Sequence, residues 1–183
     1  MSLKKMMYAT VALVTSWAGP AVAVSVPVYG PICDISTRVS STTYYSCSGS
    51  SHTALDMGNG TCSEWNHRGM LGGSFYYVYF GGCANSCTGD GGCNGGAGNY
   101  VRVAGSNGWD WRQLHINSNA TSGSKTCDRC ALGLVGATGS ATHAHVHADN
   151  RQYGTRSTAW YTGYGTTCGS SAYCGDIIGY ATL

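Results

Sequence analysis

Hydrophobic positions in this chain fall in short runs, rich in β-branched and aromatic residues and separated by glycine. Beyond the N-terminal segment, no run repeats with the helical period of 3.6 residues. Short runs bounded by turn residues predict an all-β fold of antiparallel strands, forming a sheet or sandwich with an open groove and disulfide-rich loops. Six runs are predicted as strands: Ser74–Phe80, Tyr100–Ala104, Trp109–Ile116, Ala131–Val135, His143–Ala148 and Thr158–Tyr164.

The segments between these runs carry turn and loop signals. Asn107-Gly108 separates two runs and predicts a tight β-hairpin. Residues 24–51 are interpreted as either an extended lead strand or a mobile arm. The segment Cys83–Gly98 is predicted to be a loop insertion pinned by its own cysteines, Cys83, Cys87 and Cys93.

The N-terminus has the pattern of a secretory signal peptide. Lys4 and Lys5 precede an apolar run from Met6 to Ala18, and Ala21-Val22-Ala23 provides an A-x-A cleavage pattern. We therefore predict residues 1–23 as a signal peptide and the protein as secreted, either extracellular or, in a Gram-negative bacterium, periplasmic. The run is too short for a membrane anchor, and no later run is long enough to span a bilayer.

The near-zero charge of the chain after the N-terminal segment argues against nucleic acid as a binding partner. The formal net charge of +2 arises from Lys4 and Lys5, because the rest of the chain has equal numbers of basic and acidic residues. Such a chain lacks the positive field that attracts nucleic acid. We predict no nucleic-acid partner and no membrane span, and we expect a monomer.

All 10 cysteines follow the predicted signal peptide. An even number of cysteines in a secreted chain predicts disulfides. The spacing Cys127-x-x-Cys130 is compatible with half a zinc knuckle or a redox pair, but no helix pattern follows it, which favours a structural disulfide. The pairing cannot be deduced from sequence, although Cys168 and Cys174 are near enough to close a short terminal loop.

The stretch richest in candidate metal-binding and catalytic side chains contains His143, His145 and His147. Residues two apart on a strand face the same side, so a strand here aligns imidazoles. Imidazole is a common zinc ligand and a general base near neutral pH. A second candidate pair, His52 and Asp56, is four residues apart. An extended strand of about 3.3 Å per residue separates them too far to share a metal, so either the chain bends between them or long side chains converge from a loop.

These motifs together resemble the lysostaphin-type (LytM-like, β-lytic) zinc metallopeptidases. The resemblance rests on H-x-x-x-D at 52–56, a lone histidine at the end of Gly95–Ile116 (GGAGNYVRVAGSNGWDWRQLHI), and H-x-H at 145–147. Leu132–His147 (LGLVGATGSATHAHVH) is similar to the family pattern I-G-x-V-G-x-T-G-x-S-T-G-P-H-L-H, and Leu55-Asp56-Met57 is similar to the β-lytic branch. The ordered set extends roughly from residue 52 to residue 149, and we predict the peptidase-like β domain as residues 52–183.

The resemblance implies one Zn²⁺ per chain and hydrolysis of peptide bonds in bacterial peptidoglycan, at bridges containing glycine or D-alanine. Carried over by position, its metal ligands are His52, Asp56 and His147. Its two catalytic histidines that do not bind metal are His115 and His145. We assign His145 as the general base, while His115 hydrogen-bonds either the tetrahedral intermediate or the water.

The sequence departs from the family pattern beside the motifs. Ala54 stands where the family has glycine, and alanine resists a positive φ, so the bend must be built differently. His143 and Ala144 replace a glycine and a proline, which alters one edge of the groove. His143 is therefore interpreted as a rim residue. Among the remaining polar candidates, His67 is predicted at the surface or in a turn, and Asp149 as an exposed carboxylate that is able to orient a histidine.

Two other functions fit the same residues. Ala54 and the cysteine-rich insertion also suit a catalytically degenerate module that binds wall peptides or glycans. A weaker hypothesis is a copper- or zinc-sequestering protein built on HAHVH, which requires neither His52 nor Asp56. The metal content and the effect of replacing those two residues distinguish the three.

Overall fold

The computed structural model describes residues 21–117 and 123–183, so residues 1–20 of the predicted signal peptide lie outside the described chain. The prediction of an all-β, antiparallel fold is confirmed. The strands are β1 (Ser25–Tyr29), β2 (Arg38–Ser41), β3 (Leu55–Gly60), β4 (Asn66–Arg68), β5 (Phe75–Phe80), β6 (Asn99–Ala104), β7 (Trp109–Asn117), β8 (Lys125–Cys127), β9 (Ala131–Val135), β10 (Ala144–Gln152), β11 (Thr155–Ser157) and β12 (Ile177–Thr182). The helices are short: two 3-10 turns, Tyr45–Cys47 and Cys93–Gly96, and α1 (Ala159–Thr162). No helix among these residues is long and apolar enough to cross a membrane.

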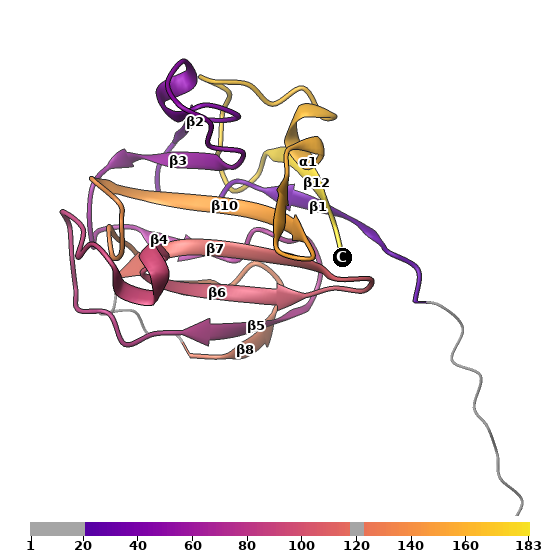
Figure 1. The fold of residues 1–183 in the computed structure, drawn as a ribbon, viewed down its shortest axis with the longest axis horizontal. Helices are drawn as coiled ribbons and strands as arrows, with labels where there is room; N and C mark the ends of the chain where they lie inside the picture. The colour runs from indigo at the N-terminus through magenta and orange to yellow at the C-terminus, as the bar shows by residue number, and fades with distance from the viewer. Residues whose placement is uncertain (1–20, 118–122) are drawn as a thin grey trace, which may run out of the picture.

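The strands form a 10-stranded sheet and a separate two-stranded sheet. The main sheet runs in the order β2-β3-β10-β7-β6-β5-β8, with β11 paired to β10, and with β4 joined through β9 to β7. Strands β3, β10, β7, β6 and β5 cross the front of the molecule one below another, and β1 pairs with β12 beside them (Figure 1). Strand β10 therefore has hydrogen-bonded neighbours on both edges, β3 and β7, and is held rigidly in the middle of the sheet.

The hydrophobic core lies behind this sheet. On β10, Val146 is fully buried in the core, while the alternate residues His145 and His147 point to the opposite face. On β7, Trp111 is also fully buried and meets Trp160 of α1 edge-on, with the ring centroids 4.9 Å apart. The strands that carry the predicted site residues are therefore fixed from behind by close aromatic and aliphatic packing.

The predicted hairpin at Asn107-Gly108 joins β6 and β7. Both residues have positive φ, 51° and 77°, and the amide of Trp109 donates to the carbonyl of Ser106 at 2.9 Å. This is the turn that asparagine followed by glycine favours, because its twist matches that of the paired strands. Of the six predicted strands, five are confirmed with small shifts at their ends.

The prediction of a strand at Thr158–Tyr164 is wrong, because this segment contains α1. The amides of Thr162 and Gly163 donate to the carbonyls of Thr158 and Ala159, which closes one helical turn. Adjacent residues on a strand point to opposite faces, whereas in this turn Trp160 and Tyr161 are both buried. Burial of both neighbouring aromatic rings on one side of the chain favours the helical turn more strongly than the β propensity of these residues favours a strand.

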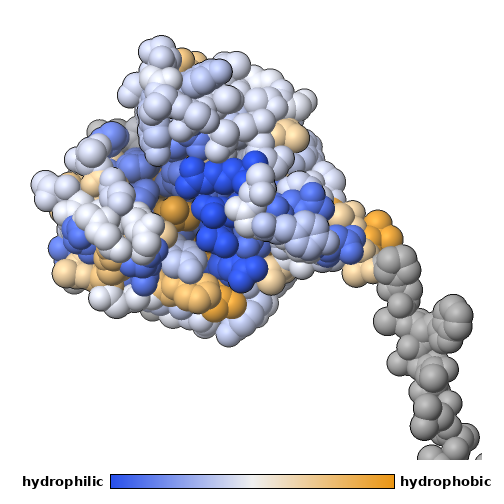
Figure 2. Space-filling model, in the orientation of Figure 1, coloured by the Kyte–Doolittle hydropathy of each residue, from blue (hydrophilic) through white to orange (hydrophobic). Residues whose placement is uncertain are grey.

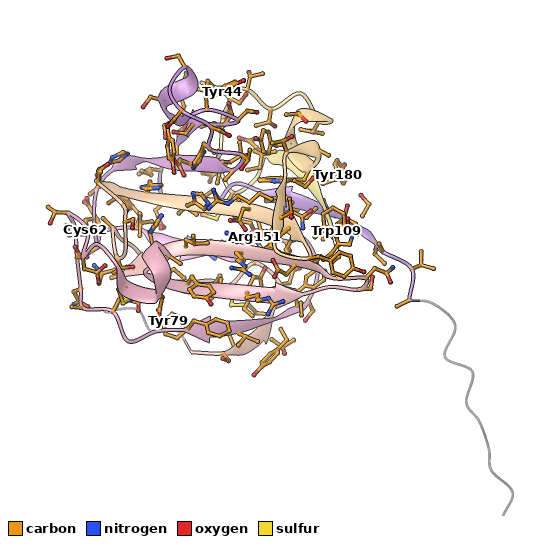
Figure 3. All side chains as sticks on the ribbon, in the orientation of Figure 1. Tyr44, Cys62, Tyr79, Trp109, Arg151 and Tyr180 are labelled. Atoms are coloured by element: carbon orange, nitrogen blue, oxygen red, sulfur yellow. A yellow bond between two sulfur atoms is a disulfide. The ribbon has the colours of Figure 1, made fainter. Side chains whose placement is uncertain are left out.

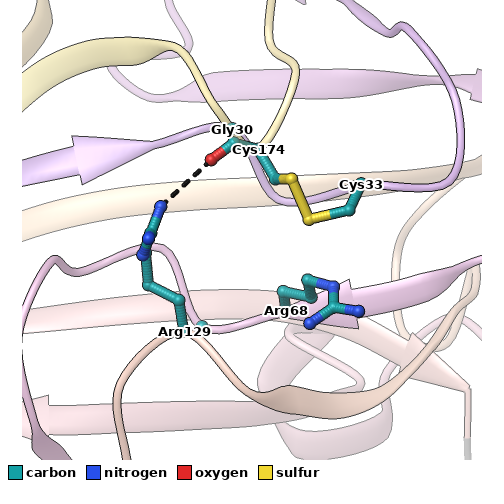
Figure 4. Close-up of a pocket in the computed structure, with 6 residues that line it drawn as sticks. Gly30, Cys33, Arg68, Arg129 and Cys174 are labelled. Atoms are coloured by element: carbon teal, nitrogen blue, oxygen red, sulfur yellow. Dashed lines mark hydrogen bonds between the residues drawn. A yellow bond between two sulfur atoms is a disulfide. The ribbon is translucent and has the colours of Figure 1, made fainter.

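All cysteines are paired, and none is free. Cys127–Cys130 is a structural disulfide, as predicted, and Cys62–Cys87 and Cys83–Cys93 pin the loop insertion. The suggested Cys168–Cys174 pair is wrong. The terminal segment instead lies along the N-terminal strands and forms Cys47–Cys168 and Cys33–Cys174. A small cavity of about 130 Å³ lies beside the latter disulfide, where Arg129 donates to the carbonyl of Cys174 at 3.2 Å (Figure 4).

The prediction of His67 at the surface is also wrong. His67 is fully buried on β4, and its Nε2 lies 2.9 Å from Nε2 of Gln113. Gln113 donates through that nitrogen, so the proton of His67 resides on Nδ1, which has no hydrogen-bond partner in the described structure. Burial, with a smaller contribution from His145, lowers the pKa of His67 from 6.5 to about 3.

His67 is expected to make the protein less stable in mild acid. Its pKa is lower in the folded protein than in the unfolded chain, so the unfolded chain binds the proton more readily, and stability falls as pH drops from 6.5 towards 3. Between pH 7 and pH 5 this contributes a loss of about 2 kcal/mol. Guanidinium unfolding at the two pH values should show a loss of stability that is about 2 kcal/mol smaller in His67→Gln than in the wild type, because the other buried histidines, such as His115, titrate in both proteins. The exposed-histidine control His143→Gln should keep the wild-type dependence, and equal pH slopes for all three proteins would contradict the assignment.

Candidate metal centre

Three residues predicted as metal ligands meet where β3 and β10 lie side by side. Asp56 on β3 is directly opposite His147 on β10 in the antiparallel register. His52 lies in the loop before β3, and all three side chains are at least nine-tenths buried. The sheet thus brings together residues that are 91 and 95 positions apart in the chain.

The bend between His52 and Asp56 is built at Thr53. Thr53 has a φ of 56°, in the left-handed region, while Ala54 is not among the residues with positive φ. The Thr53 hydroxyl donates to the carbonyl of His52 at 2.7 Å, which supports this unusual conformation for a β-branched residue. Ala54 therefore does not adopt the positive φ that alanine resists, and it does not prevent His52 from approaching Asp56.

The three potential ligand atoms form a small triangle. His147 Nδ1 lies 2.9 Å from Asp56 Oδ1 and 3.1 Å from His52 Nε2, and His52 Nε2 lies 3.2 Å from Asp56 Oδ1. Ligand atoms of a tetrahedral zinc ion, with bonds of about 2.0–2.1 Å, are separated by about 3.3 Å. Two imidazoles and a carboxylate at this spacing fit such an ion and leave its fourth position open.

The hydrogen bonds of His52 set its ring for this role. Its Nδ1 donates to the carbonyl of Thr42 at 2.9 Å, so the lone pair of a neutral ring is on Nε2 and faces the triangle. Tyr45 covers the ring, with centroids 4.3 Å apart. Tyr45 is a site residue that the sequence analysis missed, since no motif marks it.

Asp149 supports His147 from the other side. Asp149 is fully buried, so the prediction of an exposed carboxylate is wrong. Its Oδ2 lies 3.4 Å from His147 Nε2, a position from which it is able to orient that histidine, as the sequence suggested. Arg151 donates two hydrogen bonds to Asp149, at 2.8 and 2.7 Å, and Arg156 donates a third at 3.0 Å. These ion pairs offset the cost of burying the carboxylate. The alternation Asp149-x-Arg151 along one strand face was the sequence signal for this network.

Asp149→Asn is expected to weaken zinc binding without abolishing it. The neutral amide holds the Nε2 side of His147 less firmly, and losing such a partner typically reduces metal affinity about 10- to 100-fold. Competition with a chromophoric chelator measures the affinity. Asp176→Asn, which changes a carboxylate far along the chain, serves as the control and should match the wild type. An unchanged affinity in Asp149→Asn would contradict the supporting role.

His115 reaches the site through a distortion of β7. The register of β6 and β7 shifts by one residue here, and His115 has a φ of 66°. A bulge of this kind re-aims a side chain that regular alternation would send elsewhere. His115 Nδ1 donates to the carbonyl of Thr138 at 2.8 Å, and its ring lies 4.8 Å from that of His145 between centroids.

His145 and His143 differ in position despite their spacing. His145 is buried on β10, its Nδ1 donates to the carbonyl of His143 at 2.8 Å, and its Nε2 lies 3.4 Å from Asp56 Oδ1. His143 precedes the strand and is exposed at the rim of the groove. Among the described residues, the clusters able to hold a metal do not include His143, which argues against a site made of the three alternating histidines.

The surroundings of two site residues, Asp56 and His115, lower the pKa values of both side chains. Burial alone would raise the pKa of Asp56, but contacts with His145, His147 and His52 hold it far below its usual value. Burial, together with the neighbouring histidines, lowers the pKa of His115 to about 3, so its ring is neutral at physiological pH. A neutral His115 that donates from Nδ1 presents an accepting Nε2 to the site.

A groove of about 640 Å³ opens above these residues. Figure 2 shows strongly hydrophilic atoms along the hollow on this face of the molecule. The insertion forms one wall, through Asn94 to Ala97, and His143 lies on the rim. Arg112, Arg151 and Arg156 line the groove as well, and the sequence analysis had assigned them no role.

Comparisons with known proteins support the fold. No family model and no curated protein sequence matches this chain. A chain from the crystal structure of the SpoIIIAH and SpoIIQ complex superposes with a TM-score of 0.50 and 14% identity, over 72% of this chain and 96% of that one. At this identity the similarity establishes a shared fold alone.

Two peptidases are among the other similar structures. A zinc-containing peptidase from Vibrio cholerae has a TM-score of 0.48 and 17% identity over 75% of this chain, which spans only 40% of that peptidase. The catalytic domain of lysostaphin from Staphylococcus simulans has a TM-score of 0.42 and 16% identity, over 75% of this chain and 89% of that domain.

Proposed function

We propose that this protein is a secreted zinc metalloendopeptidase that hydrolyses peptide bonds in bacterial peptidoglycan. The observation that carries the proposal is the triangle of His52 Nε2, Asp56 Oδ1 and His147 Nδ1 at 2.9–3.2 Å, next to two further histidines. The motif resemblance supplies the substrate class, cross-bridges that contain glycine or D-alanine.

The donor set suits zinc in a catalytic rather than a structural role. Structural sites are closed by four protein ligands, whereas two imidazoles and one carboxylate leave a position for water. When bound, zinc lowers the pKa of a water molecule to near 7 and polarises a peptide carbonyl.

The two remaining histidines are suited to different tasks. His145 donates from Nδ1 to a backbone carbonyl, so its Nε2 is free to accept a proton from the attacking water and pass it to the leaving amine. His115 is a poor base because burial lowers its pKa to about 3. Its accepting Nε2 instead orients the water or a substrate N–H, which favours the water-binding role over contact with the tetrahedral intermediate.

The proposal is tested with the chain from residue 24 onward, purified peptidoglycan and a pentaglycine peptide. Release of new amino groups should require one zinc per chain, stop when a chelator removes the metal, and return when zinc is restored. A protein that holds no zinc and binds the wall without cutting it would instead be the degenerate binding module. Zinc retained fully after replacement of His52 or Asp56 would point to the sequestering protein.

A further inference from the structure

We infer that the groove contains a carboxylate-binding site formed by Arg112, Arg151 and Arg156, which selects peptides with a free carboxylate about two to four residues from the scissile bond. This inference rests on the proposed function and narrows its substrate class. All three arginines line the groove, and Arg151 lies near the middle of the sheet between β10 and β7 (Figure 3).

Each arginine is fixed by a buried carboxylate. Arg151 and Arg156 bind Asp149, and Arg112 binds Asp110 at 3.3 and 3.2 Å. Arg156 also donates from Nη1 to the carbonyl of His52 at 2.8 Å. The guanidinium groups are therefore held in place before any ligand arrives, which reduces the entropy lost on binding.

Donors remain available after these contacts. Among the described residues, Nη1 of Arg112, Nη1 of Arg151 and Nη2 of Arg156 have no partner. The arginine side chains are 23%, 18% and 30% exposed. Partly desolvated guanidinium groups with free N–H bonds are well suited to bind a planar carboxylate.

The local charge also favours an anion. Asp149 is shared by two arginines, and Asp110 is shared by Arg112 and Arg102. Each buried carboxylate thus leaves one positive charge in excess. The only carboxylate among the described groove-lining residues is Asp56, which faces the proposed metal.

The position of the arginines matches a peptide lying along β10. His147, Asp149 and Arg151 occupy alternate positions on one strand face, and each step of two residues covers about 6.7 Å. An extended peptide advances by a similar distance for every two residues. A scissile bond at His147 therefore places the arginines near a substrate residue about two to four positions away.

The substrate side of the inference is tested with two wall preparations. Both are peptidoglycan freed of phosphate-containing polymers and acetylated on amino groups, and in one the carboxylates are converted to primary amides. Zinc-loaded wild-type protein should bind and cut the carboxylate form with a KM about tenfold lower. Equal binding and cleavage of the two forms would overturn the inference. Binding to untreated wall that is absent from both phosphate-free preparations would overturn it as well.

The protein side is tested with a matched pair of variants. Arg102 and Arg112 are cross-strand neighbours that share Asp110, but only Arg112 lines the groove. Arg112→Gln should raise KM about tenfold on the carboxylate form and leave the amide form unchanged, with kcat retained. Arg102→Gln lowers the nearby positive charge but removes no hydrogen-bond donor from the groove, so it should raise KM on the carboxylate form clearly less than Arg112→Gln does. Equal effects of the two substitutions, or a loss confined to kcat, would overturn the carboxylate site.

Binding separates this inference from the proposed function. Co-sedimentation with insoluble peptidoglycan does not require cleavage. A protein that prefers the carboxylate form but cuts neither would refute the peptidase proposal and retain the anion site. A protein that cuts both forms equally would retain the peptidase and refute the anion site.

Discussion

Asp56→Asn is expected to remove bound zinc and to lower kcat/KM on peptidoglycan by more than about a hundredfold. Asp56 Oδ1 lies within 3.4 Å of ring nitrogens from three histidines, His52, His145 and His147. The substitution keeps the size of the side chain but removes the negative charge that contacts all three rings, whereas Asp149 contacts His147 from the other side. A divalent ion then loses both an anionic ligand and the charge that offsets its own desolvation.

Metal analysis after dialysis and the release of amino groups measure the two effects together. Asp128→Asn is the matched control, because that side chain is 58% exposed and remote from the proposed ligands, so it should retain one zinc and full activity. Circular dichroism establishes that Asp56→Asn is folded. A folded Asp56→Asn protein with one zinc and wild-type activity would contradict the assignment of Asp56 as a ligand.

His145→Ala is expected to retain zinc while kcat falls about 10²- to 10⁴-fold, the usual contribution of a general base. His145 is adjacent to the proposed ligand triangle, but its Nε2 is 3.4 Å from Asp56, and His147 is the residue of this strand that we propose as the ligand. The result would separate catalysis from metal binding, which Asp56→Asn cannot do.

His143→Ala is the matched control for His145→Ala. The two residues are two positions apart, yet His143 is exposed and precedes the strand. Its removal should change kcat less than about tenfold, since the proposed mechanism assigns it no proton transfer. A larger loss in His143→Ala than in His145→Ala would reverse the two roles, and loss of zinc from His145→Ala would make that residue a ligand.

Much of the candidate site was visible in the sequence because its residues carry strong local signals. The spacing of His145 and His147 places two imidazoles on one strand face, and H-x-x-x-D requires a bend that the structure supplies at Thr53. The Asn107-Gly108 turn and the pinned insertion were likewise predicted, because their conformations depend on neighbouring residues. The assignment of individual roles stays a prediction until the substitutions are measured.

Other features depended on contacts that no local pattern encodes. The segment Thr158–Tyr164 has β-forming residues, but packing of Trp160 against Trp111 selects a helical turn. His67 resembles a surface histidine in sequence, and only the packing around β4 reveals it as buried and neutral. The terminal cysteines pair with partners 121 and 141 residues away, which spacing along the chain cannot indicate.

The sequence by itself determined the all-β class and the pairing of cysteines in general, because periodicity and composition are local properties. Its resemblance to a peptidase family supplied the prediction of which histidines and which aspartate form the site. Only the tertiary structure decided that Asp56 lies opposite His147, that a bulge turns His115 into the site and that three arginines face the groove. Strand register and side-chain packing join residues far apart in the chain, and no short stretch of sequence contains both partners of such a contact.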